Sequence, residues 1–403
     1  MRLTILNQFY APDISPTAQL AASLAEHRAS LGDQVTVLSG RAGYVAGRSP
    51  VGAAGAPIAD SPVRVRRVWT PNLGKTSVPR RLLGYVSYLL GAAVRMVVLP
   101  RQDVIVTMTT PPLVVAVGLL HKLLHPRTRV VLWSMDCYPD AAERFGRLEP
   151  GGRVSRLLRA VNRMVFRRLD RVIALDGAMA ELLASQYAAG PDRPPVSVVP
   201  NWERSDRFPA GASPVPWAGY DELGVDGRIV VVYMGNAGVG HRFDTVLEAA
   251  TRLQHEAVFL FIGGGARREA LQASAADRKL GNVMFHGYVP EEDTAGVMAG
   301  ADGALITLDD RSLGLMSPSK LHANLAAGLP VLYVGPAGSN VDDAIHAFQC
   351  GTSLREGDVD GLLAAVRALR DDDGARVRAR QAFEQAYSDT AVLPRFDAYL
   401  DAG

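Results

Sequence analysis

Short apolar runs alternate with segments of helical periodicity along the first half of the chain. The apolar runs read LTILNQF, QVTVLSG, DVIVTMT, RVVLWSM and RVIAL, and residues 17–31, 111–124 and 177–188 have the helical pattern. Strands that alternate with helices form a parallel sheet with helices on both faces and ligands at the carboxyl ends of the strands. This half therefore predicts a doubly wound α/β domain.

The same alternation restarts after a long, proline-rich segment, GPDRPPVSVVPNWERSDRFPAGASPVPWAG. The later apolar runs read RIVVVYMG, AVFLFIGGG, NVMFHGY, GALITL and LPVLYVG. A chain of 403 residues is also too long for one ordinary hydrophobic core. We expect two Rossmann-like, doubly wound α/β domains that face a cleft, residues 1–205 and 206–385. The remaining residues, 386–403, are expected to form a C-terminal helix that crosses back to the first domain.

Composition excludes several classes of protein. The formal net charge of +2 gives no argument for a nucleic-acid partner. Cys137 and Cys350 are far apart and fit no metal or disulfide framework, which agrees with a reducing cytoplasm. The first residues run directly into an apolar strand pattern without a secretory signal, so we expect a cytoplasmic protein.

Basic residues are concentrated in two segments. Residues 61–100 hold seven basic residues and no acidic one: Arg64, Arg66, Arg67, Lys75, Arg80, Arg81 and Arg95. Part of this segment, 82–100, is about long enough for a membrane span, but Arg95 and its small residues indicate a buried or surface-lying helix. In the second segment, 153–171, arginines and apolar residues fall on different helical faces. Both segments suit either a solvated helix face or a face toward anionic lipid or phosphate.

A glycine-rich turn opens the second domain in VVYMGNAGVGHRFDTVLEAA, residues 231–250. A strand ends before the turn and a helix begins near Phe243, so backbone N–H groups can approach a phosphate closely. The spacing is not the dinucleotide fingerprint, and an ordinary glycine turn is the alternative. Polar side chains within the turn that can face a ligand are Asn236, His241 and Arg242.

A loop, a short helix and a strand are predicted over GLMSPSKLHANLAAGLPVLYVGP, residues 314–336. Lys320 lies in the first turn of the helix, where both its ammonium group and free N–H groups favour an anion, and Ser317 and Ser319 can donate to phosphate oxygens. The alternative for Lys320 is an exposed helix lysine. No acidic residue lies between Asp310 and Asp342.

Seven segments occur in the order in which they are found in glycosyltransferase family 4. They are QFYAPDISPTAQLAASLAEHRASLGDQVTVLSG, WSMDCYPDAA, VIALDGAMAELL, VVPNW, GNAGVGHRFDTVLEAA, NVMFHGYVPEEDTAGVMAGADGALITL and PSKLHANLAAGLPVL. The whole chain resembles this family, and most of all the branch with bacterial exopolysaccharide enzymes of the colanic-acid type. The resemblance implies the GT-B architecture of two Rossmann-like domains. It also implies retaining transfer of a hexosyl group from a nucleotide diphosphate sugar, with UDP or GDP, to a hydroxyl acceptor, and no further cofactor.

The resemblance also assigns residues. Asp136 matches an acidic or histidine position that faces the transferred sugar, although it could instead cap the helix that Pro139 would start. Lys320 replaces a missing phosphate-binding lysine, so Asp136 and Lys320 are the predicted catalytic residues. The acceptor-side loop near the reaction centre matches Ser15, Pro16 and Thr17, where the family often has paired glycines. The predicted donor-binding residues are Gly235, Asn236, Gly238, His241, Arg242, Gly263, Tyr288, Val289, Leu315, Met316, Ser317, Ser319 and Leu321.

Two departures from the family pattern concern the donor. Asn236 and His241 stand where an arginine and a lysine usually bind the donor phosphates. Leu315 and Ala323 align with two glutamates of many family members, so the expected ribose clamp is missing and ribose recognition is left open.

Retention without an obvious protein nucleophile implies a front-face displacement in which the leaving diphosphate helps to deprotonate the acceptor. Lys320, with His241 or Arg242 and backbone N–H groups, would stabilise the growing charge. The acidic residues Asp309, Asp310 and 371–373 form no convergent ligand pattern, so we predict metal-independent activity.

The acceptor and the class of activity have alternatives. Our hypothesis is a glycan or polyprenyl-diphosphate-linked sugar at an anionic membrane surface, with the protein on the inner face of the cytoplasmic membrane; a soluble small molecule is the alternative. A catalytically silent sugar-nucleotide-binding partner protein is a second class. A sugar-nucleotide epimerase, the third, would need acid and base carboxylates that the second domain does not obviously offer.

Overall fold

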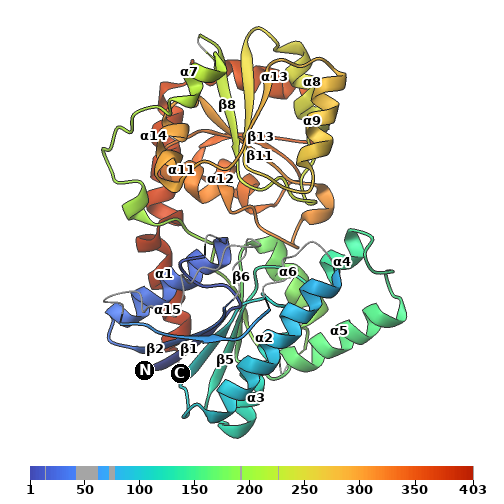
Figure 1. Cartoon of the computed structure of the whole chain (residues 1–403), viewed down its shortest axis with the longest axis vertical. Helices are drawn as coiled ribbons and strands as arrows, with labels where there is room; N and C mark the ends of the chain where they lie inside the picture. The colour runs from blue at the N-terminus through green and yellow to red at the C-terminus, as the bar shows by residue number, and fades with distance from the viewer. Residues whose placement is uncertain (14, 42–61, 72–77, 191–192, 226, 403) are drawn as a thin grey trace. The chain divides into compact units, whose positions relative to one another are not determined.

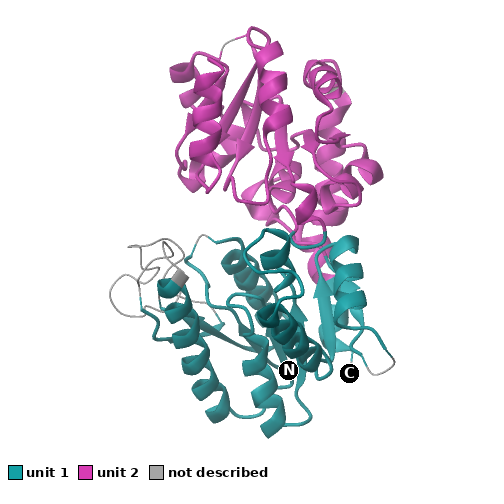
Figure 2. Ribbon diagram, turned by 90° about the vertical axis from the view of Figure 1, so that its right-hand side faces the viewer, with its two compact units in different colours: residues 1–199, 314–316, 395–403 teal, residues 200–313, 317–394 magenta. Residues whose placement is uncertain are grey.

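The computed structural model describes residues 1–13, 15–41, 62–71, 78–190, 193–225 and 227–402. These residues form two compact units (Figure 2). Unit 1 comprises residues 1–199, 314–316 and 395–403, and unit 2 comprises residues 200–313 and 317–394. Lys75 of the first basic segment lies outside the described residues.

Unit 1 is built on a seven-stranded sheet in the order β3-β2-β1-β4-β5-β6-β7, and every neighbouring pair is parallel. The strands are β1 (Arg2–Leu6), β2 (Gln34–Gly40), β3 (Arg64–Val68), β4 (Val104–Thr107), β5 (Arg129–Trp133), β6 (Arg171–Ala174) and β7 (Val196–Val198). The order reverses between β1 and β4, as in doubly wound folds. In the register of the central strands, Ile5 lies beside both Val37 and Val106, and all three side chains are fully buried.

Helices cover both faces of this sheet (Figure 1). They are α1 (Pro16–Ser30), α2 (Val78–Val98), α3 (Val115–Leu124), α4 (Asp140–Arg144), α5 (Arg153–Phe166) and α6 (Gly177–Gln186). Because βαβ crossovers are right-handed, α1, which leads to β2, and α3, which leads to β5, lie on opposite faces. Helix α2 packs against α3 and also contacts β2 and β3, and α3 contacts α5. One face of the sheet therefore carries α2, α3 and α5.

Unit 2 repeats the design with six parallel strands in the order β10-β9-β8-β11-β12-β13. The strands are β8 (Ile229–Met234), β9 (Ala257–Ile262), β10 (Val283–His286), β11 (Gly303–Thr307), β12 (Val331–Val334) and β13 (Gly351–Leu354). The α-helices are α7 (Gly219–Leu223), α8 (Asp244–Arg252), α9 (Arg268–Asp277), α10 (Thr294–Ala299), α11 (Lys320–Ala326), α12 (Asn340–Phe348), α13 (Val359–Ala368) and α14 (Asp373–Ala382). Short 3-10 turns lie at Ser205–Arg207, Glu291–Asp293 and Asp310–Ser312, and a π-helical turn covers Phe383–Tyr387. The predicted pair of doubly wound α/β domains is confirmed.

The last helix, α15 (Asp389–Asp401), ends in unit 1, as the sequence predicts. Within that unit the Phe396 ring is fully buried and meets Trp133 edge-on, with the ring centroids 4.8 Å apart. The Arg28 guanidinium, on α1, donates to the carboxylates of Asp397 at 2.9 Å and Asp401 at 2.8 Å. An aromatic contact and ion pairs therefore attach the C-terminus to unit 1.

Candidate functional site

In unit 2, two glycine-rich loops that follow β8 and β9 interlock at the carboxyl end of the sheet. The Gly235 N–H donates to Ile262 O at 2.8 Å, and the Ala237 N–H donates to Gly264 O at 2.7 Å. Gly265 has a φ of +125°, and a Cβ there would lie 2.4 Å from Ala237 O. The two loops can approach this closely only because glycine has no side chain.

Lys320, at the start of α11, crosses the first of these loops. Its Nζ donates to Asn236 O at 3.1 Å, lies 3.4 Å from His241 Nε2 and sits 4.8 Å from the centroid of the Tyr233 ring. The Lys320 side chain also packs over Gly235, where a Cβ would lie 3.4 Å from its Cε. Lys320 is therefore half-buried and held in place, unlike a freely exposed helix lysine.

His241 fixes the orientation of this lysine. Its Nδ1 lies 2.6 Å from Thr307 O, and because a carbonyl only accepts, Nδ1 carries the proton and Nε2 is free to accept from Lys320. Burial, followed by the nearby Lys320 cation, lowers the pKa of His241 to about 3, although the hydrogen bond to Thr307 opposes the change. The imidazole is thus neutral at pH 7, so it acts here as an acceptor and not as a second cation.

Lys320 retains its charge at neutral pH. Burial lowers the pKa of its ammonium group from its ordinary value to about 8. An ammonium has three N–H donors, and two of them point to Asn236 O and His241 Nε2. The third makes no hydrogen bond among the residues that the structure describes and has only the Tyr233 ring nearby, so it is available to an anion.

Four further predicted donor residues lie around this group. Gly238 lies beside two residues that contact the lysine, since a Cβ there would be 3.6 Å from Asn236 Nδ2 and 4.0 Å from the His241 ring. Gly263 has a φ of +122°, and a Cβ there would lie 2.4 Å from Gly235 O. Tyr288 is 67% exposed and lies over Gly264, and Val289 follows it on the same loop.

Other predicted donor residues are placed differently. Arg242 is directed toward acidic groups, Asp244 at 3.3 Å and Glu356 at 3.9 Å. Leu321 is fully buried in the core, and its N–H donates to Pro318 O at 3.4 Å. Ser317, which is half-buried, and Ser319, which is exposed, precede α11. Ser319 is the N-cap residue of this helix, but its hydroxyl makes no capping hydrogen bond.

Leu315 and Met316 belong to unit 1, whereas the other predicted donor-binding residues belong to unit 2. Leu315 O accepts from the Cys137 N–H at 3.1 Å, and the neighbouring Gly314 lies against Ala178 O. In the structure, therefore, this stretch of the 314–336 segment packs beside Asp136.

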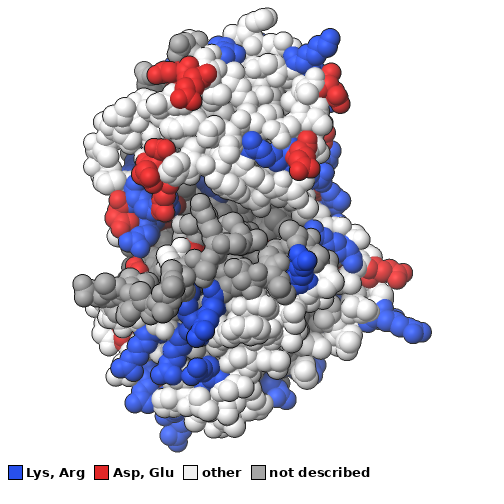
Figure 3. Space-filling model, viewed as in Figure 1, with Lys and Arg blue, Asp and Glu red and all other residues white. Residues whose placement is uncertain are grey.

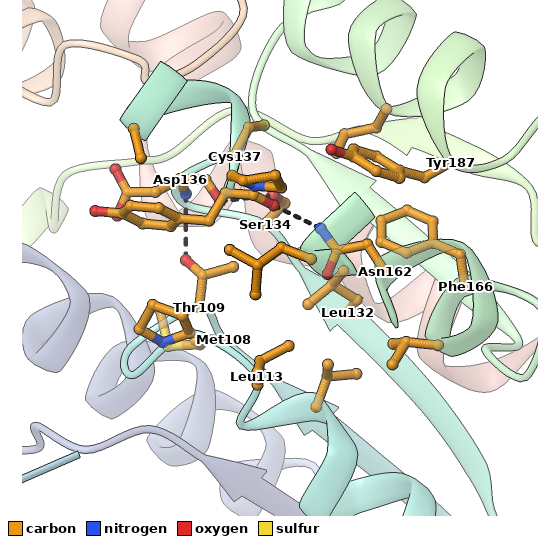
Figure 4. A pocket seen from close by; sticks show the side chains of 18 of the residues that line it. Met108, Thr109, Leu113, Leu132, Ser134, Asp136, Cys137, Asn162, Phe166 and Tyr187 are labelled. Carbon is orange, nitrogen blue, oxygen red and sulfur yellow. Dashed lines mark hydrogen bonds between the residues drawn. The ribbon is translucent and has the colours of Figure 1, made fainter. Parts of the chain in front are cut away.

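Asp136 lies in unit 1, in the turn after β5. The Thr109 hydroxyl oxygen accepts from the backbone N–H groups of Met135 and Asp136, each at 3.2 Å, and thereby fixes this turn (Figure 4). Burial raises the pKa of the Asp136 carboxyl to about 6, so it is mostly ionised at pH 7. The alternative of a helix N-cap is not seen, because α4 begins at Asp140 and its N-cap is Pro139.

The acceptor-side loop residues Ser15, Pro16 and Thr17 form the start of α1 in unit 1. Ser15 is its N-cap residue and Pro16 its first residue, but the Ser15 hydroxyl makes no capping hydrogen bond. The Ser15 N–H donates to Asp13 Oδ1 at 2.9 Å, and Thr17 O accepts from Asn7 Nδ2 at 3.3 Å. Backbone groups of this loop are thus partly used within the protein.

Sequence reasoning missed the groups that support Lys320. Tyr233 lies beneath the ammonium group and Thr307 O orients His241. They act through a ring face and a backbone carbonyl, and neither group belongs to a recognisable sequence motif. Arg268 was also missed; its guanidinium donates to His286 O at 2.7 Å and so ties α9 to the end of β10. The contact between Lys320 on α11 and the Tyr233 ring on β8 joins residues far apart in the sequence, so it is seen only in the folded structure.

Among the described residues, no group of three or more His, Cys, Asp or Glu side chains is arranged to hold a metal ion.

Two family models match the chain. One, described as "Glycosyl transferase 4-like domain", matches residues 17–202, and the other, described as "Glycosyl transferases group 1", matches residues 228–372. Between them the models span most of both units.

Two bacterial glycosyltransferases are similar in sequence to this chain over most of their length. The chain is 25% identical over 308 residues to "Probable glycosyltransferase WbjE" of Pseudomonas aeruginosa, which covers 74% of each chain. It is 26% identical over 283 residues to WcaI of Escherichia coli K12, named for colanic acid biosynthesis, covering 69% of this chain and 68% of that protein. Among solved structures, HepE of Anabaena, in complex with UDP-glucose, superposes with a TM-score of 0.68 and 13% identity over 100% of both chains. At that identity the likeness concerns the fold.

Proposed function

The chain belongs to the glycosyltransferases in which a 4-like domain precedes a group 1 domain, and from this premise we propose the reaction that it catalyses. It transfers a hexosyl group, with retention and without a metal ion, from a UDP or GDP sugar to a hydroxyl acceptor in cell-surface polysaccharide or glycolipid assembly. The observation that carries the proposal is the Lys320 ammonium, held at the glycine-rich loops with one N–H donor available. The complex of HepE with UDP-glucose supports a nucleotide sugar as the donor.

The work of Lys320 in this reaction is electrostatic. Charge grows on the donor diphosphate as its bond to the sugar breaks, and a fixed cation beside it stabilises the transition state more than the ground state. Asn236 O and His241 Nε2 hold the ammonium in position before the reaction, so little reorganisation is needed. The neutral His241 avoids repulsion of the lysine that a second cation would cause.

Asp136 has a positioning role toward the transferred sugar in this proposal. Its carboxylate, mostly ionised at pH 7, accepts hydrogen bonds from sugar hydroxyls. Thr109 holds the turn that carries it, and the leaving diphosphate itself takes part in the deprotonation of the acceptor.

A second proposal concerns the place of action, the inner face of the cytoplasmic membrane. Unit 1 exposes an apolar stripe on α2, with Leu90 64% and Val94 67% exposed, and Leu157 on α5 is 64% exposed. Arginines flank these residues, and the view in Figure 3 shows blue side chains gathered over unit 1 with little red between them. Residues Pro79–Val98 have the length and composition of a membrane span, yet α2 packs along the sheet through Tyr88, whose hydroxyl donates to Leu38 O at 2.8 Å. A helix held in this way suits interfacial binding to anionic lipid.

The donor half of the proposal is tested with nucleotides before any acceptor is known. A ligand that binds the folded state stabilises it by mass action, so UDP, GDP and their sugars are compared by thermal shift. We expect one base to raise the Tm, and slow hydrolysis or transfer when membrane extract supplies an acceptor. Binding without turnover in that extract would instead identify a silent sugar-nucleotide-binding partner protein, and absence of binding to every nucleotide would overturn the proposal.

A further inference from the structure

Unit 1 contains a cavity for which the proposed reaction names no ligand. Its volume is about 230 Å³, and Asp136 lies at its edge (Figure 4). Its wall comes from α3, β5, α4, α5 and α6 and from the loops after β4, β5 and α4, and it is mostly apolar. Representative lining residues are Met108, Leu132, Leu148, Leu158, Phe166 and Leu183.

Three of the polar side chains that line this cavity, Tyr187, Asn162 and Thr109, already have partners within the protein. The Tyr187 hydroxyl donates to Asp140, and Asn162 Nδ2 donates to Tyr138 O at 2.5 Å. Thr109 Oγ1 accepts from two backbone N–H groups. A polar ligand group that enters the cavity would give up its hydrogen bonds to water and find few protein partners. A hydrocarbon group makes no hydrogen bonds to water, so it has none to lose.

The mouth of the cavity has a different character. Leu113 and Tyr138, which line it, are 38% and 44% exposed, so the cavity opens to solvent there. Burial raises the pKa of Tyr138 to about 12, Asp136 and Tyr85 add to this rise, and the cations of Arg81 and Arg147 oppose it. The cations of Arg81 and Arg147 thus act electrostatically on Tyr138, which lines the cavity. Neither Arg81 nor Arg147 has an ion-pair partner among the described residues.

We propose that this cavity holds the prenyl chain of a lipid phosphate acceptor, with the phosphate at Arg81 and Arg147 and the acceptor sugar beside Asp136. The inference rests on the proposed function, because Asp136 faces the transferred sugar there. A hydrocarbon group takes up about the same room as a water molecule, ~30 Å³, so the cavity admits roughly eight carbon atoms, between one and two isoprene units.

The same helix that lines the cavity supports a membrane origin for the chain. On α5, Leu158 and Val165 line the cavity, while Leu157 and Met164 next to them are 64% and 53% exposed among exposed arginines. A chain that leaves a bilayer beside α5 would have a short apolar path to the cavity. This continuity favours a lipid over a free apolar metabolite.

The experiment measures binding, so that no acceptor sugar has to be known. Geranyl phosphate, dimethylallyl phosphate and inorganic phosphate are titrated into the full-length protein by calorimetry below the micelle concentration. We expect geranyl phosphate to bind at least tenfold more tightly than dimethylallyl phosphate, and inorganic phosphate to bind most weakly. In Ala142→Phe, which fills the cavity from α4, the preference for the longer chain should disappear, whereas Ala116→Phe, on the exposed side of α3, should keep it.

Leu148→Trp provides a second test if Ala142→Phe folds poorly, since Leu148 lines the cavity from a loop that accommodates a larger side chain more easily. Equal binding of all three phosphates by the wild type, or a chain-length preference that survives in both filled variants, would overturn the inference. If a nucleotide sugar is turned over with a soluble acceptor but prenyl phosphates do not bind, the inference fails and the proposed function stands. If prenyl phosphates bind through the cavity but no nucleotide does, the proposed function fails.

Discussion

Among single residues, Lys320 carries most of the proposed chemistry, and its removal gives the sharpest prediction. Loss of one preorganised donor to developing negative charge typically lowers kcat by about 10²–10³-fold. We expect a loss of that size in Lys320→Ala, with little change in Tm, measured as donor hydrolysis or transfer. Lys279→Ala removes an exposed lysine of the same unit and should leave the rate unchanged. Equal rates for Lys320→Ala and wild type would remove Lys320 from the mechanism.

The shifted pKa values of Asp136 and Lys320 also predict how the rate depends on pH. Asp136 has a pKa of about 6 and must be ionised, and Lys320 has a pKa of about 8 and must be protonated. The kcat/KM of the free enzyme should therefore rise as the pH increases through 6 and fall as it passes 8. Bound diphosphate favours the charged lysine, so the alkaline limb of kcat should lie at higher pH.

Variants assign the limbs of this profile. Asp136→Asn should lose the acid limb, and Lys320→Ala the alkaline limb, each at a reduced rate. An alkaline limb that persists unchanged in Lys320→Ala would mean that another group titrates there.

At the scale of elements, the interlocked loops after β8 and β9 depend on glycine. Ala at position 265 would need a left-handed φ, which costs about 1–3 kcal/mol, and would place its Cβ 2.4 Å from Ala237 O. Gly265→Ala should thus lower the free energy of unfolding in urea and weaken nucleotide binding by thermal shift. Gly281→Ala is the matched control, since a Cβ there meets nothing within 4 Å. A Gly265→Ala protein with wild-type nucleotide affinity would separate these loops from the donor site.

The C-terminal end of α15 depends on a largely buried charge. The Arg28 side chain is 4% exposed and pairs with Asp33 at 2.6 Å, Asp397 at 2.9 Å and Asp401 at 2.8 Å. Loss of one partner from a buried ion-pair network costs about 3–5 kcal/mol, and the partial exposure of Asp401 places the expected cost at the lower end. Arg28→Ala should therefore expose the C-terminus to limited proteolysis and lower the Tm. Arg101→Ala, which breaks an exposed pair with Asp103, should change neither.

Most strands were predictable because they are largely apolar runs, such as IVVVY in β8, and parallel sheets bury both faces of their strands. The edge strands β3 (RVRRV), β7 (VSV) and β13 (GTSL) were missed, because they are short or polar and contain no such run. The group around Lys320 was only half predictable. The type of residue at positions 236, 241 and 320 indicated anion chemistry, but Tyr233 and Thr307 act through ring face and carbonyl, which no motif marks. The cavity beside Asp136 was not predictable, since apolar residues from five elements line it and each alone resembles a core residue.

At the scale of the whole molecule, the exposed apolar stripe of α2 predicts association with membranes. Apolar patches of this kind on a monomer mark an interaction surface, and basic residues nearby favour anionic lipid. The wild type should co-sediment with vesicles that contain phosphatidylglycerol, less with vesicles of phosphatidylcholine alone, and less as the salt concentration rises. Leu90→Gln with Val94→Gln should weaken binding at least tenfold, because burial of each side chain contributes about 1.5–3 kcal/mol. Val215→Gln with Val377→Gln removes two exposed valines of unit 2, which are 83% and 57% exposed, and should bind as the wild type does. Binding that is indifferent to lipid charge, salt and the α2 substitutions would leave a soluble acceptor as the better proposal.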